Sequence, residues 1–191
     1  MSWDQVGFRV IYGLTGNSVM DTAMMLAADY LVLLLPLSLV YLWFQDRRGK
    51  EDAGYTFYAS VLGILLSYGM SMVYFHKNPS AVYDTIAAYH SENSFPSQHT
   101  AALFASALPL IYRERENLGG LLMAAGLLTG FSRIYIGEHW PVDIAGAFIA
   151  AAAGLFTACK TWNMLEPVWR PVVDISEKAE AEIKEKVKRR K

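Results

Sequence analysis

The sequence predicts an all-α membrane protein: a polytopic bundle of about five transmembrane helices, with an interfacial helix before it and a cytoplasmic helix after it. Of the 191 residues, 53% are hydrophobic, and mean hydropathy is +0.21. The apolar residues form long blocks instead of alternating at the short periods of a soluble domain. Five such blocks leave too little polar sequence to cover a water-soluble globule.

The two longest apolar blocks have the length of membrane-spanning helices. From Thr22 to Phe44 the only charged residue is Asp29, and from Ala53 to Phe75 there is none. A helix of this length crosses a hydrocarbon core of about 30 Å. Three shorter blocks are also expected to span: Pro96 to Tyr112, Leu118 to Ile136 and Trp140 to Thr161.

Both ends of the chain differ from the apolar middle. Near the amino terminus, Phe8, Val10, Ile11 and Leu14 favour a short amphipathic helix at the interface, and no cleavable signal peptide is indicated. From residue 166 onward Glu and Lys alternate, which predicts a charged helical tail. We therefore expect a membrane-embedded domain over residues 1–165 and a cytoplasmic tail over 166–191.

Basic residues predict the orientation of the spans. They lie in three segments, which the positive-inside rule assigns to the cytoplasm: Arg47 to Lys50, Arg113 to Arg115, and Lys184 to Lys191. Five alternating spans put these three segments on one side. The amino terminus and the loops 76–96 and 133–140 then lie on the extracytoplasmic side of a multi-pass cell-membrane protein.

One polar motif precedes the third apolar block, in the segment Phe95 to Thr100. Pro96 suits the first turn of a helix, and helix amino termini bind phosphate through free backbone N–H groups. The Ser97 hydroxyl could add a donor, and His99 could act as a proton donor at the same place.

A second motif lies between the fourth and fifth blocks and contains Ser132, Arg133, His139 and Asp143. Because His139 and Asp143 are four residues apart, helical geometry would place them on one face within hydrogen-bonding reach. A carboxylate on one ring nitrogen fixes the tautomer and leaves the other nitrogen as a nucleophile. Arg133 offers a fork of donors for phosphoryl oxygens.

These two motifs, Pro-Ser-x-His at 96–99 and Ser-Arg-x5-His-x3-Asp at 132–143, resemble those of the type 2 phosphatidic acid phosphatase superfamily. The layout of an interfacial segment followed by five spans is similar to that of its undecaprenyl-diphosphatase branch.

The resemblance implies a helix bundle in which His139 attacks phosphorus, Asp143 orients His139, and His99 protonates the leaving oxygen. Water then cleaves the phosphohistidine. It also implies that phosphate is bound by Arg133, Ser97 and the backbone around Gln98. No metal or other cofactor is expected.

The chain departs from the family pattern upstream, where the family has a lysine seven residues before an Arg-Pro pair. This sequence has Lys77-Asn78-Pro79, so asparagine stands in the arginine position, and Ser71 stands in the lysine position. Lys77 and Asn78 are the candidates for this part of the phosphate site, with His76 as a weaker one. Lysine is a point charge and cannot replace the bidentate fork of arginine.

Three classes of function follow. The first is a lipid phosphatase, with a polyprenyl diphosphate as the favoured substrate and phosphatidic acid or phosphatidylglycerophosphate as the alternative. The second is a metal-dependent or metal-binding membrane protein using His99, His139 and Asp143. The third is a catalytically impaired relative that binds a lipid phosphate or a partner. The expected partners are the bilayer and a lipid phosphate; a nucleic acid is not expected.

Overall fold

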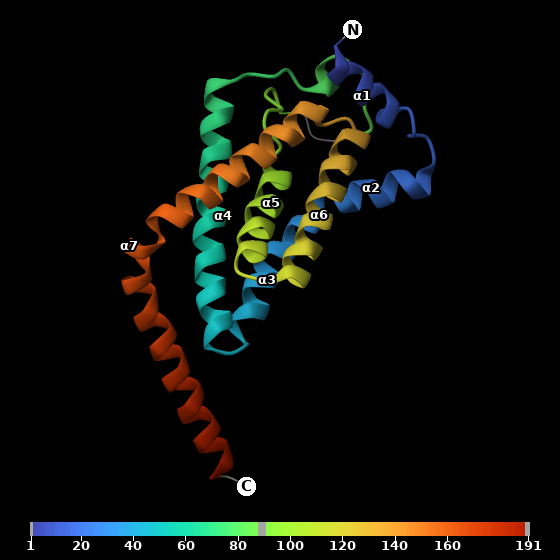
Figure 1. Ribbon diagram of the computed structural model, residues 1–191. Coiled ribbons are helices and arrows are strands. Elements are labelled where there is room, and N and C mark those ends of the chain that lie inside the picture. The colour runs from blue at the N-terminus through green and yellow to red at the C-terminus, as the bar shows by residue number, and fades with distance from the viewer. Residues whose placement is uncertain (1, 88–90, 190–191) are drawn as a thin grey trace.

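The computed structural model describes residues 2–87 and 91–189, and within them the chain is a bundle of helices (Figure 1). In chain order these are α1 (Trp3–Tyr12), α2 (Ser18–Tyr30), the 3-10 helix η1 (Leu31–Leu33), α3 (Leu34–Trp43), α4 (Arg47–Val73), the 3-10 helix η2 (Pro79–Ala81), α5 (Gln98–Tyr112), α6 (Glu116–Tyr135) and α7 (Pro141–Lys188). The predicted all-α fold class is confirmed. The described residues contain one isolated antiparallel bridge, between Lys77 and Asn93.

Within the part of the chain that the structure describes, four helical stretches are long and apolar enough to cross a membrane: Ser18–Trp43, Arg47–Val73, Glu116–Tyr135 and Pro141–Lys188. The first stretch, Ser18–Trp43, combines α2, η1 and α3 into one helical segment. Helix α5 has 15 residues, so it rises about 22 Å, less than a hydrocarbon core of about 30 Å. It packs against α4, α6 and α7 near the centre of the bundle (Figure 1). The number of spans therefore stays a prediction.

Helices α4 and α7 approach each other closely at glycine. A Cβ atom on Gly154 of α7 would lie 2.5 Å from the Cα of Gly63 on α4. Gly146 and Ala150 of α7 are buried together with Gly154. Small side chains let two backbones meet where lipid supplies no hydrophobic force between helices.

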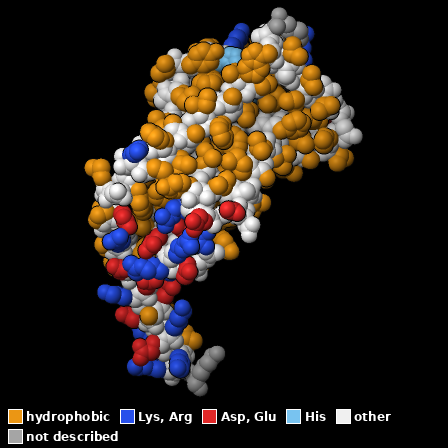
Figure 2. All heavy atoms as spheres, in the orientation of Figure 1, with side chains coloured by type: hydrophobic (Ala, Val, Ile, Leu, Met, Phe, Trp, Pro, Cys, Tyr) orange, Lys and Arg blue, Asp and Glu red, His pale blue; other side chains and the backbone are white. Residues whose placement is uncertain are grey.

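The charged tail is not a separate helix, because α7 runs unbroken from residue 141 to residue 188. The predicted domain boundary at residue 165 falls inside it, and a division into two domains stays a prediction. The tail pairs with the start of α4: Lys50 Nζ lies 3.0 Å from Glu180 Oε1, and Arg47 Nη1 lies 2.7 Å from Asp174 Oδ1. In Figure 2 the charged side chains gather at this end, and hydrophobic side chains cover most of the rest of the visible face.

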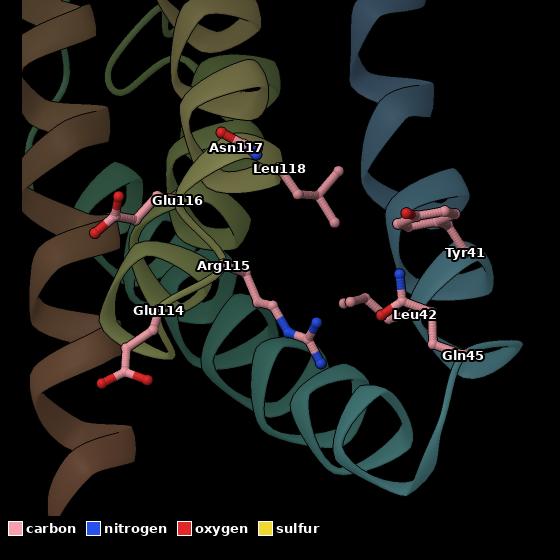
Figure 3. A pocket seen from close by; sticks show the side chains of 8 residues that line it. All are labelled: Tyr41, Leu42, Gln45, Glu114, Arg115, Glu116, Asn117 and Leu118. Atoms are coloured by element: carbon pink, nitrogen blue, oxygen red, sulfur yellow. The ribbon is translucent and has the colours of Figure 1, made fainter.

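The α5–α6 turn adds a second ion cluster at the same end. The buried Asp52 carboxylate accepts from Arg113 Nε and Arg115 Nε, each at 2.7 Å. Figure 3 shows Arg115 reaching into a cavity of about 260 Å³ between this turn and the end of α3. Glu114 and Glu116 point away from that cavity (Figure 3). The residues predicted to be cytoplasmic thus form one ion-paired end of the bundle.

The α4–α7 contact gives a direct test. Gly154→Ala should lower the thermal unfolding temperature of the purified protein, because overpacking a tight contact costs about 1–3 kcal/mol. The matched control is Gly69→Ala on α4, where an added Cβ meets nothing within 4 Å. Equal unfolding temperatures for the two variants would contradict a tight α4–α7 contact.

Candidate active site

A cavity of about 400 Å³ lies at the other end of the bundle, where α4 ends and α5 begins. Gln98, His99, Arg133 and His139 line it, together with Tyr68 and Ser71 of α4 and loop residues between 91 and 96. Four of the residues singled out from the two sequence motifs therefore face one space, although they come from α5, α6 and the α6–α7 loop.

The α6–α7 loop presents His139 to this cavity. Helix α6 ends at Tyr135, and Gly137 then takes a φ of +89°, which glycine adopts readily. Helix α7 starts at Pro141, so Asp143 lies in its first turn and accepts the Trp140 N–H at 2.8 Å. His139 Nδ1 lies 3.3 Å from Asp143 Oδ2, as the four-residue spacing predicts.

Asp143 also contacts a second histidine. His76, in the loop after α4, places its Nδ1 2.9 Å from Asp143 Oδ1. On the other side of the ring, His76 Nε2 lies 3.9 Å from an oxygen of Asp4 on α1. Sequence reasoning considered His76 only as a weak substitute cation and did not single out Asp4.

Asp4 links α1 to the start of α7. Its Oδ1 accepts the N–H of Val142 at 2.9 Å, which satisfies a free donor in the first turn of α7. Burial raises the pKa of the Asp4 carboxyl, while the Val142 hydrogen bond and the nearby His76 act to lower it. Phe8 of the same helix packs on Trp140, with ring centroids 5.0 Å apart.

Arg133 is held by two carboxylates. Its Nη2 pairs with Glu138 Oε2, and its Nη1 lies 3.4 Å from Asp29 Oδ1. The buried Nε finds no hydrogen-bond partner within residues 2–87 and 91–189. The sequence could not show that Glu138 folds back on Arg133, although an acidic residue five positions after an arginine was a visible signal.

His99 connects the cavity to an apolar space. Together with Gln98 it also lines a smaller cavity of about 180 Å³, whose other walls are Val32, Ile64, Tyr68 and Ala102. The polar end and the apolar end therefore meet at one turn of α5. Such a pair of spaces suits a ligand with a charged head and a hydrocarbon tail.

Ser97, Lys77 and Asn78 lie outside the lining of the described cavity. Ser97 is fully buried, and its hydroxyl lies 3.0 Å from that of Thr100. The Lys77 side chain is exposed, while its carbonyl accepts the Trp140 indole N–H at 2.8 Å. Buried Asn78 donates to the Glu138 carbonyl at 3.0 Å. The predicted phosphate-binding roles of these three residues stay predictions.

The geometry also bears on metal binding. Across residues 2–87 and 91–189, no group of three or more His, Cys, Asp or Glu side chains is arranged to hold a metal ion. His99 and His139 face the cavity, whereas Asp143 directs its oxygens to two histidines and a backbone N–H.

The comparisons with known proteins agree with one another. Residues 54–166 match the family described as the PAP2 superfamily. The undecaprenyl-diphosphatase BcrC of Bacillus subtilis (strain 168) is 32% identical over 174 residues, which are 89% of this chain and 90% of that protein. The crystal structure of Aquifex aeolicus LpxE shares the fold, with a TM-score of 0.69 and 24% identity, covering 84% of this chain and 96% of that one.

The buried contacts of Asn78 allow a test by substitution. Asn78→Ala leaves the Glu138 carbonyl and the Ser80 N–H without this partner, so it should destabilise the protein by about 1–3 kcal/mol. Thermal unfolding measures the change. Lys77→Ala is the matched control and should unfold like the wild type, because it removes only an exposed side chain. A stable Asn78→Ala variant would mean that the loop does not depend on this amide.

Proposed function

Because this chain belongs to the PAP2 superfamily and is a membrane lipid phosphatase, we propose that it hydrolyses a polyprenyl diphosphate of undecaprenyl or dolichyl type. The products are the polyprenyl monophosphate and inorganic phosphate. The observation that carries the proposal is the pairing of His139 with buried Asp143 beside Arg133 and His99 at one cavity. The name of the Bacillus subtilis relative supports this choice of substrate.

In the proposed mechanism His139 is the nucleophile. The Asp143 carboxylate keeps a proton on Nδ1, and the free Nε2 attacks the terminal phosphorus. A bond forms between Nε2 and phosphorus while the bond to the bridging oxygen breaks, and His99 gives a proton to that oxygen. Water then hydrolyses the phosphohistidine and releases inorganic phosphate. Arg133 stabilises the charge on the transferring phosphoryl group.

The apolar cavity beside His99 suits the hydrocarbon part of the substrate. Val32 comes from η1 and Ile64 from α4, so the space lies between two segments that can span the membrane. A prenyl chain in this space would keep the diphosphate at the polar end. A glycerolipid phosphate offers a similar division of head and tail, and phosphatidic acid and phosphatidylglycerophosphate remain the alternative substrates.

Substitution of the nucleophile tests the function. His139→Ala should reduce phosphate release by at least about a thousand-fold, because no phosphohistidine can form there. The assay uses purified protein with isoprenoid diphosphates, isoprenoid monophosphates and glycerolipid phosphates in parallel. Met164→Ala, an exposed position on α7, serves as the control. Wild-type turnover by His139→Ala would contradict the mechanism.

The same assay separates the other classes of function. Activity is expected to persist in EDTA; loss that a divalent metal restores would favour the metal-dependent class. If the wild type bound lipid diphosphate without releasing phosphate, the chain would be an impaired relative. Faster release from glycerolipid phosphates than from isoprenoid diphosphates would favour the alternative substrates.

We further propose that the cavity with His139 faces the extracytoplasmic side. In a Cys159→Ser background, a membrane-impermeant maleimide should label Glu92→Cys in intact cells and Glu182→Cys only after the cells are opened. Both positions are exposed, and Cys159 is the only native cysteine. Labelling of Glu182→Cys in intact cells would reverse the topology.

A further inference from the structure

The Asp143 carboxylate is fully buried, and both of its oxygens have partners. Oδ2 accepts the Trp140 N–H at 2.8 Å and faces His139 Nδ1 at 3.3 Å. Oδ1 faces His76 Nδ1 at 2.9 Å, which is the shorter of the two histidine contacts. An ionised carboxylate only accepts hydrogen bonds, so His76 must carry its proton on Nδ1 to make this bond.

His76 is outside the cavity that His139 and His99 line. Its side chain is 24% exposed, and its ring lies beside Trp140 and Tyr74, with centroids 5.6 Å and 6.0 Å away. It can therefore influence the reaction through Asp143 and not by touching a ligand in the cavity. Its backbone is also held, because its N–H donates to Asn93 Oδ1 at 2.9 Å.

A carboxylate with one free oxygen can rotate about its Cβ–Cγ bond and exchange partners. With Oδ1 bound by His76 and Oδ2 by the Trp140 N–H, rotation of Asp143 would break two hydrogen bonds inside a buried site. Unpaired buried acceptors are costly, so the carboxylate plane is fixed. A fixed plane keeps the His139 ring in one orientation and one tautomer.

We infer that His76 is a positioning residue, whose hydrogen bond to Asp143 holds the Nδ1 proton of His139 in place and leaves Nε2 free to attack. Asp4 of α1 extends this series of side-chain contacts. It faces His76 Nε2 at 3.9 Å and also accepts the N–H of Val142 at the start of α7. The interfacial helix is thus connected to the reacting histidine. This inference rests on the proposed phosphohistidine chemistry.

Two substitutions of His76 separate hydrogen bonding from packing. In His76→Asn the side-chain amide nitrogen takes the place of Nδ1, so a donor to Asp143 is kept and the ring is lost. In His76→Phe a ring of similar shape is kept and the donor is lost. Thermal unfolding and helical circular dichroism are measured for both variants, so that changes in rate are compared between folded proteins.

His76→Phe should lower kcat and the single-turnover rate of phosphoenzyme formation by roughly 10- to 100-fold, the usual loss when a partner that orients an active group is removed. KM should change by less than about twofold, because His76 does not line the cavity. His76→Asn should recover most of the rate. Full activity of His76→Phe with loss in His76→Asn, or a rise in KM as the main effect, would overturn the inference.

The substitution Asp4→Asn tests the contact between Asp4 and His76. The asparagine oxygen can still accept the Val142 N–H, so the start of α7 keeps this bond while the charge beside His76 is removed. We expect a loss of several-fold in kcat, and no further loss when the change is added to His76→Phe, because the two residues act through one path. Independent, additive losses would contradict the link through His76.

A measurement without substrate separates this inference from the proposed function. Imidazole 15N chemical shifts report which ring nitrogen of His139 carries the proton. A single tautomer protonated on Nδ1 is expected in the wild type and in His76→Asn, and a mixture is expected in His76→Phe. An unchanged tautomer in His76→Phe would overturn the inference. Failure of the wild type to hydrolyse any lipid diphosphate would defeat the proposed function alone.

Discussion

The buried carboxylate of Asp143 is the constraint on which the His139 end of the bundle depends. Removing a carboxylate from water without partners costs many kcal/mol, so the fold must supply donors for both oxygens. They come from the loop after α4, through His76, and from the α6–α7 loop, through Trp140 and His139. Segments distant in the sequence thus meet at one carboxylate, whose oxygens both receive hydrogen bonds.

Helix α7 connects the Asp143 site to the ion pairs at the opposite end of the bundle. Asp143 lies in its first turn, and near its other end Glu180 pairs with Lys50, whose side chain is 2% exposed. Between these points Gly154 packs on the backbone of Gly63, which leaves little room for sliding. A shift of α7 along α4 would disturb both charged ends at once. The tail and the first turn of α7 are thus joined in one continuous helix.

Much of this arrangement could be predicted from local sequence, because apolar blocks report helices and the His139–Asp143 spacing reports one helical face. The hydrogen-bonding partners of these residues could not be predicted from local sequence. Asp4 and His76 reach Asp143 and α7 only through the fold, and no periodicity encodes such a contact. The tail was predicted as a separate helix because its composition changes at Glu166, but α7 stays helical through this point and through Pro167 and Pro171, so the change in composition does not mark a helix end. The apolar composition of α5 fits a membrane span and equally fits a helix packed among α4, α6 and α7, so composition alone does not separate the two.

The upstream departure from the family pattern now has a physical reading. Asn78 is buried and donates a hydrogen bond to the Glu138 carbonyl, so it supports the loop that presents His139. The arginine that the family has at this position would instead add a positive charge. Arg133 is then the only Lys or Arg lining the described cavity, and it is already paired with Glu138 and Asp29. An entering phosphate must compete with these carboxylates for the guanidinium. A diphosphate carries more negative charge than a monoester and competes more strongly. The same two carboxylates also repel a diphosphate more strongly than a monoester, so the charges around Arg133 do not by themselves select one substrate class.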